Sequence, residues 1–198
     1  GEDGASHQCN EDLALMRTIP GMVVINPSDD IEARAAVRAA YEYVGPVYLR
    51  FGRLAVPTLF DSSYQFEIGK GVTLREGSDC SIIATGLCVS EALAAADTLA
   101  EQGIHAEVIN IHTIKPLDEE LVVKTAKKTG RVFTVEEHSI IGGLGAAVAE
   151  TLGEKCPTKI TRIGVNDVFG ESGPAKELLH KYGLDAEGIA NRILREMK

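Results

Sequence analysis

The feature that most constrains this chain is a repeated alternation of short apolar runs with longer amphipathic segments. The apolar runs are rich in β-branched residues and are bounded by Gly, Pro, Asn and Asp, which is typical of buried strands. The longer segments are rich in Ala and Leu with helical periodicity. Strands that alternate with helices predict an α/β fold built from open, mainly parallel sheets with helices on their faces.

The first strand–helix–strand unit occupies the beginning of the chain. Residues 22–25, M-V-V-I, predict a buried strand, residues 31–43 an amphipathic helix, and residues 47–49 a second strand. Such a unit has parallel strands and a right-handed crossover. The following residues, 55–68, have no clean period and contain Pro57 and several polar residues, so they indicate a linker.

A second α/β unit follows the linker, and the predicted domains are residues 1–62 and 63–198. We expect its strands at residues 71–75, 80–85, 106–111, 131–136 and 159–165. We expect its helices at residues 89–102, 116–127 and 142–152, followed by two more that begin near Pro174 and Asp185.

Composition excludes several functional classes. The net charge of −9 disfavours binding to nucleic acid or to an anionic membrane. The chain has no apolar run of about 18 residues, so no transmembrane helix is expected. The four cysteines form no C-x-x-C pair and no spacing typical of zinc, which favours free thiols in a reducing, cytoplasmic setting. They are Cys9, Cys80, Cys88 and Cys156.

The stretch G-E-D-G-A-S-H-Q at the beginning of the chain offers a candidate site. Its small residues allow the backbone to approach a ligand closely. Asp3 can accept a hydrogen bond and His7 can carry a proton near neutral pH. The alternative is a surface turn in which Asp3 bonds to the local backbone.

Arg53 is a second candidate, because it follows a buried strand and a glycine. The carboxyl ends of parallel strands are where open α/β sheets bind ligands. A guanidinium group matches phosphate oxygens in two parallel hydrogen bonds. The alternative for Arg53 is an ion pair on the protein surface. Arg50, at the end of the same strand, is a weaker candidate for ligand binding.

Two other patterns resemble a nucleotide-binding site and a metal site, but their spacing does not support either. Residues 142–145, G-G-L-G, follow a strand but lack the G-x-G-x-x-G spacing of dinucleotide-binding turns, so we expect these glycines to allow close packing. Glu136, Glu137 and His138 are adjacent on a strand. Their side chains alternate between its two faces, which disfavours a shared metal site.

Several separated motifs resemble the transketolase family, which uses thiamine diphosphate. They include the first loop, E-D-L-A-L-M-R-T-I-P-G-M, T-I-K-P-L-D and F-G-E-S-G-P-A-K-E-L-L, and the similarity covers the whole chain. It implies the end of a pyrimidine-binding domain, with one sheet edge left unpaired, followed by a complete transketolase C-terminal domain. The Glu that activates the cofactor lies upstream of these motifs in the family.

The resemblance implies transfer of a two-carbon ketol unit from a ketose phosphate to an aldose phosphate, as in the pentose phosphate pathway. His7 would then be catalytic, and Asp3, His7 and Arg53 would bind the sugar phosphate. Thiamine diphosphate and Mg²⁺ would be held mainly by an N-terminal transketolase domain or subunit. The assembly would be a homodimer or a heterotetramer, and the 198 residues alone are expected to be inactive.

Three alternatives remain. A 1-deoxyxylulose-5-phosphate synthase segment also carries D-G-x-[ST]-H and an arginine pair resembling Arg50 and Arg53, although E-D-L-A and T-I-K-P-L-D favour transketolase. The beta subunit of 2-oxo acid dehydrogenases lacks the D-G-x-S-H-Q loop. A non-catalytic interaction or dimerisation module is the alternative from a different functional class.

Overall fold

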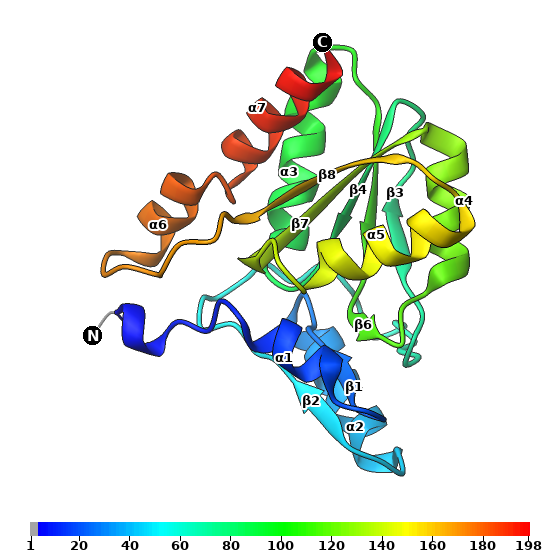
Figure 1. Cartoon of the computed structure of the whole chain (residues 1–198), viewed down its shortest axis with the longest axis vertical. Helices are drawn as coiled ribbons and strands as arrows, with labels where there is room; N and C mark the ends of the chain where they lie inside the picture. Colours follow the sequence, from blue (N-terminus) through cyan, green and yellow to red (C-terminus); the bar gives the residue numbers. More distant parts are fainter. Residues whose placement is uncertain (1–3) are drawn as a thin grey trace.

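The computed structural model describes residues 4–198 and contains two sheets, each with helices packed on it (Figure 1). The described part of the chain starts with a single 3-10 turn and a short helix, and then forms a strand–helix–strand unit. These elements are η1 (Ala5–His7), α1 (Asp12–Thr18), β1 (Val23–Ile25), α2 (Asp30–Glu42) and β2 (Val47–Leu49). Helix α2 begins where the Asp29 side chain accepts a hydrogen bond from the backbone N–H of Glu32, an ordinary N-cap.

The rest of the chain alternates strands and helices after a long segment without either. Its strands are β3 (Val72–Arg75), β4 (Cys80–Ala84), β5 (Ala106–Asn110), β6 (Thr113–Lys115), β7 (Arg131–Ser139) and β8 (Lys159–Val165). Its helices are α3 (Cys88–Glu101), α4 (Glu119–Thr129), α5 (Leu144–Lys155), α6 (Ala175–Tyr182) and α7 (Ala186–Met197). None of the helices described over residues 4–198 is both long and apolar enough to cross a membrane.

The larger sheet has the strand order β3-β5-β4-β7-β8, and only β3 runs antiparallel to its neighbour. Both of its faces are covered. Ile82 packs with residues of α3 and α7, whereas Ile83, the next residue, packs with residues of α4 and α5. This arrangement explains why β4 is buried along its whole length instead of alternating between buried and exposed residues.

The smaller sheet has the order β2-β1-β6, and its third strand comes from the second unit. Strand β1 pairs parallel with β2 and antiparallel with β6. The sequence predicted no strand at β6, and that expectation is wrong. It also predicted one unpaired sheet edge: β6 covers the free side of β1, whereas β2 has no second strand partner among the described residues. The run T-I-K is too short to show a period, and it becomes a strand because β1 offers its free hydrogen-bonding edge.

The α/β fold with helix-flanked sheets is therefore confirmed, although each sheet is mixed and not purely parallel. The predicted linker contains no helix or strand over residues 50–71. It is nevertheless anchored, since Asp29 Oδ2 accepts hydrogen bonds from the backbone N–H groups of Leu59 (2.7 Å) and Phe60 (2.9 Å). A domain boundary near residue 62 stays a prediction.

Candidate functional site

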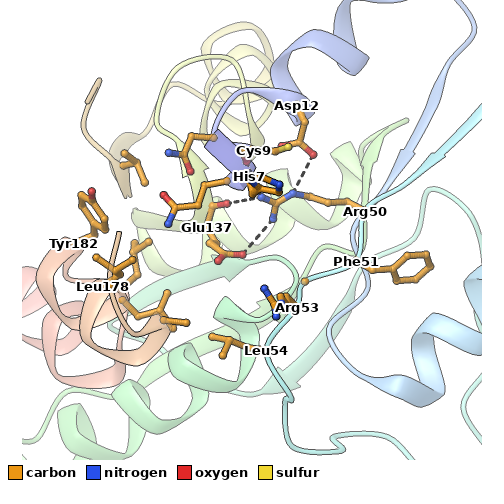
Figure 2. Close-up of a pocket in the computed structure, with 18 of the residues that line it drawn as sticks. His7, Cys9, Asp12, Arg50, Phe51, Arg53, Leu54, Glu137, Leu178 and Tyr182 are labelled. Atoms are coloured by element: carbon orange, nitrogen blue, oxygen red, sulfur yellow. Dashed lines mark hydrogen bonds and ion pairs between the residues drawn. The ribbon is translucent and has the colours of Figure 1, made fainter. Parts of the chain in front are cut away.

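A cleft of about 650 Å³ opens at the carboxyl end of β2, where the two units meet (Figure 2). Its walls come from the N-terminal loop, the residues after β2, the end of β7, and α6. Its polar lining includes His7, Gln8, Asn10, Asp12, Arg50, Arg53 and Glu137. Its apolar lining includes Leu54, Leu178, Leu179, Tyr182 and Leu184. This position agrees with the general rule that open α/β sheets bind ligands beyond the carboxyl ends of their strands.

His7 lies on the cleft wall at the end of η1, and its side chain is exposed. The turn is closed by a hydrogen bond from the His7 backbone N–H to the Gly4 carbonyl oxygen (2.9 Å). Ser6 Oγ lies 3.1 Å from His7 Nδ1, which leaves Nε2 as the ring nitrogen for a ligand. The other candidate in this loop, Asp3, lies outside the described residues.

Arg53 lines the same cleft, four positions after the end of β2. The fold thus brings together two candidates that are 46 positions apart in the sequence, one from the N-terminal loop and one from a strand end. Arg53 is exposed, as expected for a residue that meets a ligand in a cleft. The roles of Asp3, His7 and Arg53 in substrate binding stay predictions.

Arg50 is far more enclosed than Arg53, with a side chain that is 12% exposed. Its Nε donates to Asp12 Oδ2 (3.0 Å), and its Nη1 lies 3.5 Å from Glu137 Oε2. Its Nη2 donates to two backbone carbonyl oxygens, those of Cys9 (3.0 Å) and Glu137 (2.9 Å). Burial opposes ionisation, but the two carboxylates outweigh it and raise the pKa of Arg50.

Asp12 and Glu137 are site residues that the sequence analysis missed. Each joins Arg50 from a distant position in the chain, so no local pattern identifies them. Asp12 also accepts a hydrogen bond from the Tyr48 hydroxyl (2.8 Å), and burial together with this carboxylate raises the pKa of Tyr48 to about 12. For Glu137 the available signal was an acidic residue near the carboxyl end of a buried strand.

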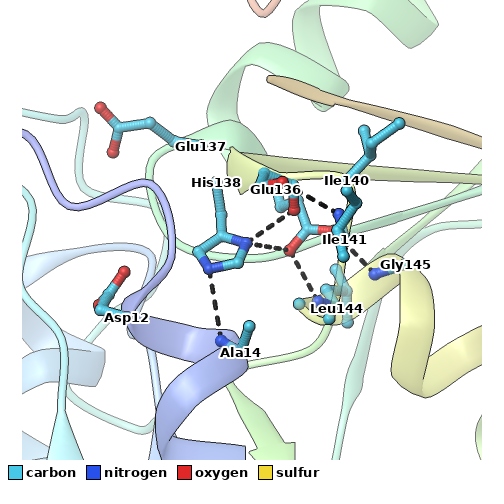
Figure 3. A network of polar contacts seen from close by, with 12 residues as sticks. Asp12, Ala14, Glu136, Glu137, His138, Ile140, Ile141, Leu144 and Gly145 are labelled. Carbon is cyan, nitrogen blue, oxygen red and sulfur yellow. Dashed lines mark hydrogen bonds and ion pairs between the residues drawn. The ribbon is translucent and has the colours of Figure 1, made fainter. Parts of the chain in front are cut away.

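At the end of β7, Glu136 and His138 share one face of the strand and Glu137 points to the other (Figure 3). Glu136 is fully buried and accepts hydrogen bonds from the backbone N–H groups of Leu144 (2.7 Å) and Gly145 (2.8 Å) at the start of α5. His138 Nε2 accepts from the Ala14 N–H in α1 (3.4 Å), and Glu137 turns toward the cleft. The alternation of side chains expected from the sequence therefore holds: His138 Nδ1 lies 3.7 Å from Glu136 Oε2 in the protein interior, and only Glu137 of the three lines the cleft.

The glycine-rich run before α5 allows close packing. A Cβ atom at Gly143 would lie 2.0 Å from Glu136 Oε2, and one at Gly145 would lie 2.8 Å from Thr134 Oγ1. The Glu136 carboxyl group occupies the helix N-terminus, where a bound phosphate would otherwise interact with the free N–H groups. This part of the chain does not fit a nucleotide or a diphosphate.

Among the described residues, no group of three or more His, Cys, Asp or Glu side chains is arranged to hold a metal ion. All four cysteines are free, and burial raises the pKa of Cys80 to about 12, so that its thiol is neutral. The cleft instead combines two guanidinium groups, an imidazole and two carboxylates, and Arg53 is the more exposed of the two arginines. These groups suit a small anionic ligand that also carries hydroxyl groups.

Comparison with known proteins identifies the two parts of the chain separately. Residues 1–58 match the family model of the transketolase pyrimidine-binding domain, and residues 69–189 match that of the transketolase C-terminal domain. A 6-deoxy-6-sulfo-D-fructose transketolase subunit of a Clostridium species is 49% identical over 94% of this chain and 58% of its own length. A 1-deoxy-D-xylulose-5-phosphate synthase of Heliobacterium modesticaldum is 41% identical over 100% of this chain and 31% of its own length.

Solved structures agree with these matches. A structure described as a split gene transketolase, inactive beta4 tetramer, superimposes with a TM-score of 0.94 at 49% identity, over 98% of this chain and 64% of that one. The chain therefore spans about three-fifths of the length of the Clostridium subunit and of the split gene transketolase chain. From the pyrimidine-binding and C-terminal domain matches and from these relatives, we conclude that the chain belongs to the transketolase family.

Proposed function

We propose that this chain is the section or subunit of a thiamine diphosphate-dependent transketolase that binds the sugar phosphate. The complete enzyme transfers a two-carbon ketol unit from a ketose phosphate to an aldose phosphate. The observation that carries the proposal is the meeting of His7 and Arg53 in one cleft at the end of β2. Arg53 binds the phosphate, and His7 hydrogen-bonds a substrate oxygen and helps transfer its proton.

The cofactor is held mainly by another domain or subunit in this proposal. Thiamine diphosphate supplies the carbanion chemistry when it is bound, and Mg²⁺ anchors its diphosphate. The buried Glu136 carboxyl group already occupies the N–H groups at the start of α5, which supports placing the diphosphate site elsewhere. The partner completes a homodimer or heterotetramer, and the four free cysteines support a reducing, cytoplasmic location.

The 198 residues alone are inactive in this proposal. The similar split gene transketolase, an inactive beta4 tetramer, supports this part of it. The test is a coupled assay of the purified chain with added thiamine diphosphate and Mg²⁺, with and without the complementary domain or subunit. Turnover by the chain without its complement would contradict the inactivity.

The role of Arg53 is tested with Arg53→Ala in the complete enzyme, with phosphorylated and unphosphorylated ketose donors. Loss of one charge-assisted contact should lower kcat/KM for the phosphorylated donor only, by an amount equivalent to roughly 1.5–3 kcal/mol of transition-state stabilisation. Arg34→Ala is the matched control, since Arg34 is an exposed arginine of the same unit that pairs with Asp30. Equal losses on both donor types would refute the phosphate assignment.

The second candidate function is 1-deoxyxylulose-5-phosphate synthesis, which the match of such a synthase over the whole of this chain favours. That reaction uses pyruvate as the donor, whereas a transketolase uses a ketose phosphate. Assaying the complete enzyme with each donor, at equal concentrations of a common aldose phosphate acceptor, separates the two. Faster turnover with pyruvate would replace the transketolase assignment by the synthase.

A further inference from the structure

Arg50 occupies a position that the proposed roles of His7 and Arg53 leave unexplained. It follows β2 directly, three positions before Arg53, and its backbone N–H still bonds to the Ile25 carbonyl oxygen at the end of β1 (2.9 Å). Its side chain leaves this sheet and extends to the N-terminal loop and to β7 (Figure 2). One residue therefore connects three segments that surround the cleft.

The hydrogen-bonding capacity of Arg50 is almost entirely used within the protein. A guanidinium group has five N–H donors. One of them, on Nε, bonds to Asp12, one on Nη1 faces Glu137, and two on Nη2 bond to the carbonyl oxygens of Cys9 and Glu137. At most one N–H is left for a ligand, so Arg50 cannot hold a phosphate in a two-pronged grip.

The charges around Arg50 also disfavour a role in binding an anion. Asp12 and Glu137 place two carboxylates against a single guanidinium group, and the three side chains are 10%, 35% and 12% exposed for Asp12, Glu137 and Arg50. A phosphate brought to this group would meet both carboxylates in a poorly solvated place. Arg53, by contrast, is exposed on the cleft wall, where a phosphate can reach it from solvent.

The hydrogen bond to the Cys9 carbonyl oxygen links Arg50 to the N-terminal loop that carries His7. Cys9 lies two positions after His7, and its neighbour Asn10 accepts a hydrogen bond through its carbonyl oxygen from the Ser139 N–H at the end of β7 (2.8 Å). The loop that carries His7 is thus fixed at two adjacent carbonyl oxygens, one bonded to Arg50 and one bonded to β7. Displacement of reacting groups by about 1 Å can cost roughly 100-fold in rate.

We propose that Arg50 is a positioning residue that fixes the His7 loop and the Arg53 strand end relative to one another through Asp12 and Glu137. It acts on the geometry of the cleft and does not bind substrate. The expected loss in kcat/KM rests on the proposed function. The expected role of Arg50 in fixing the position of the His7 loop does not. Lysine cannot replace arginine here, because a single ammonium group cannot reach four acceptors that lie around a planar fork.

The test compares Arg50→Gln and Arg50→Lys with Arg17→Lys in the complete enzyme. Arg17 is the matched control, since its guanidinium also joins the two units, by donating to the Gly142 carbonyl oxygen (2.5 Å) and to Glu150 (2.6 Å), but away from the cleft. We expect both Arg50 variants to lose roughly 10- to 100-fold in kcat/KM, mainly in kcat, and equally for phosphorylated and unphosphorylated donors. Arg17→Lys should keep both values within about threefold.

Hydrogen exchange on the same variants supplies a readout that needs no activity. The amides of His7 and Ser139 report the loop closure and its bond to β7, and we expect both to lose protection in the Arg50 variants. Amides of α3 and α7 should keep theirs in every variant. If no donor is turned over, the proposed function fails, while the exchange result still decides the role of Arg50.

Three outcomes would overturn the proposal. A loss confined to phosphorylated donors would make Arg50 a phosphate ligand. An equal kinetic loss in Arg17→Lys would reduce Arg50 to a general support between the units. Unchanged exchange at His7 and Ser139 in Arg50→Gln would show that the loop keeps its position without Arg50.

Discussion

The two sheets of this molecule are stabilised in different ways. Strands β4 and β5 of the larger sheet are buried along their whole length, and a continuous apolar core extends over them to α3 and α7. The smaller sheet has strands of three residues, its outer strand β2 is only half-buried, and its apolar clusters contain three or four buried residues. A sheet of this size is marginal by itself.

The smaller sheet depends instead on contacts from the larger unit. Strand β6 supplies its third strand, and Lys115 Nζ donates to the carbonyl oxygens of Arg17 (2.8 Å) and Ile19 (2.7 Å) at the end of α1. Two further hydrogen bonds join the units, from the Ala14 N–H to His138 and from Arg50 to the Glu137 carbonyl oxygen. The larger unit is therefore the scaffold. The smaller unit is held on it by the β1–β6 pairing, by the apolar cluster around Ile114 and by polar contacts that also shape the cleft.

A matched pair of substitutions gives the largest expected difference between the sheets. Ile82 and Ile25 are both fully buried, and they lie in β4 and β1, the central strands of their respective sheets. Ile82→Ala should lower the free energy of unfolding by about 4–5 kcal/mol, because a rigid core surrounds the cavity. Ile25→Ala should cost only about 2–3 kcal/mol, since its partly buried neighbours can close around it.

The measurement is urea unfolding of the two variants beside the parent chain. Equal losses in the free energy of unfolding would contradict the contrast between the sheets, because they would show that the smaller sheet is packed as tightly as the larger one. If Ile25→Ala lowered the free energy of unfolding more than Ile82→Ala, the smaller sheet would be the more tightly packed of the two.

The residue that joins the two cores should give the next largest effect. Ile114, in β6, is 1% exposed and packs with Leu13 of α1 and Val24 of β1. Ile114→Ala should cost about 3–4 kcal/mol. We expect hydrogen-exchange protection to fall in α1 and β1 and to persist in α3 and α7, since only the smaller sheet loses a neighbour. A uniform fall across the chain would mean that both sheets open together.

This dependence also sets the limit of what the sequence alone predicts. The larger unit follows from apolar runs and helical periods because burial on both faces fixes its strands, and every expected strand there is present within a few residues. Strand β6 was missed because its three residues gain their conformation from β1, a partner about 90 positions earlier. Arg50 was only a weak candidate, since its partners Asp12 and Glu137 come from other elements.

A buried histidine in the segment between β5 and β6 should make the stability of the protein depend on pH. His112 lies between β5 and β6, is 1% exposed, and packs against the Phe66 ring of the linker at a centroid distance of 4.3 Å. Burial lowers its pKa from 6.5 to about 4. Between these values the unfolded chain binds a proton that the folded chain does not, so stability is full above pH 6.5 and is lost as the pH falls toward 4. The loss should be about 3 kcal/mol.

Urea unfolding at several pH values checks this, with His112→Gln beside the parent chain. The variant cannot titrate at this position and should show a flatter dependence between pH 6.5 and 4. His180→Gln is the control, since His180 is exposed and Asp185 raises its pKa, which gives a small effect of opposite sign. An unchanged slope in His112→Gln would assign the acid sensitivity to other groups.

The smallest effect on stability is expected at His7, the residue proposed to take part in catalysis. His7 is exposed, and its side chain contacts only its neighbour Ser6 among the hydrogen bonds found within the described residues. His7→Ala should therefore change the free energy of unfolding by less than about 0.5 kcal/mol. A larger loss in urea unfolding would show that the loop contributes to the packing of the smaller unit.

In the complete enzyme, His7→Ala should lower kcat/KM for ketose donors and leave the affinity for thiamine diphosphate nearly unchanged, because the proposed function assigns the cofactor site to another part of the assembly. Calorimetric titration of the cofactor and steady-state kinetics check the two halves separately. A large drop in cofactor affinity would mean that the loop of the smaller unit helps to hold the cofactor. The parent-like affinity that we expect would leave the smaller unit with one task, which is to present substrate-binding groups on a scaffold that the larger sheet stabilises.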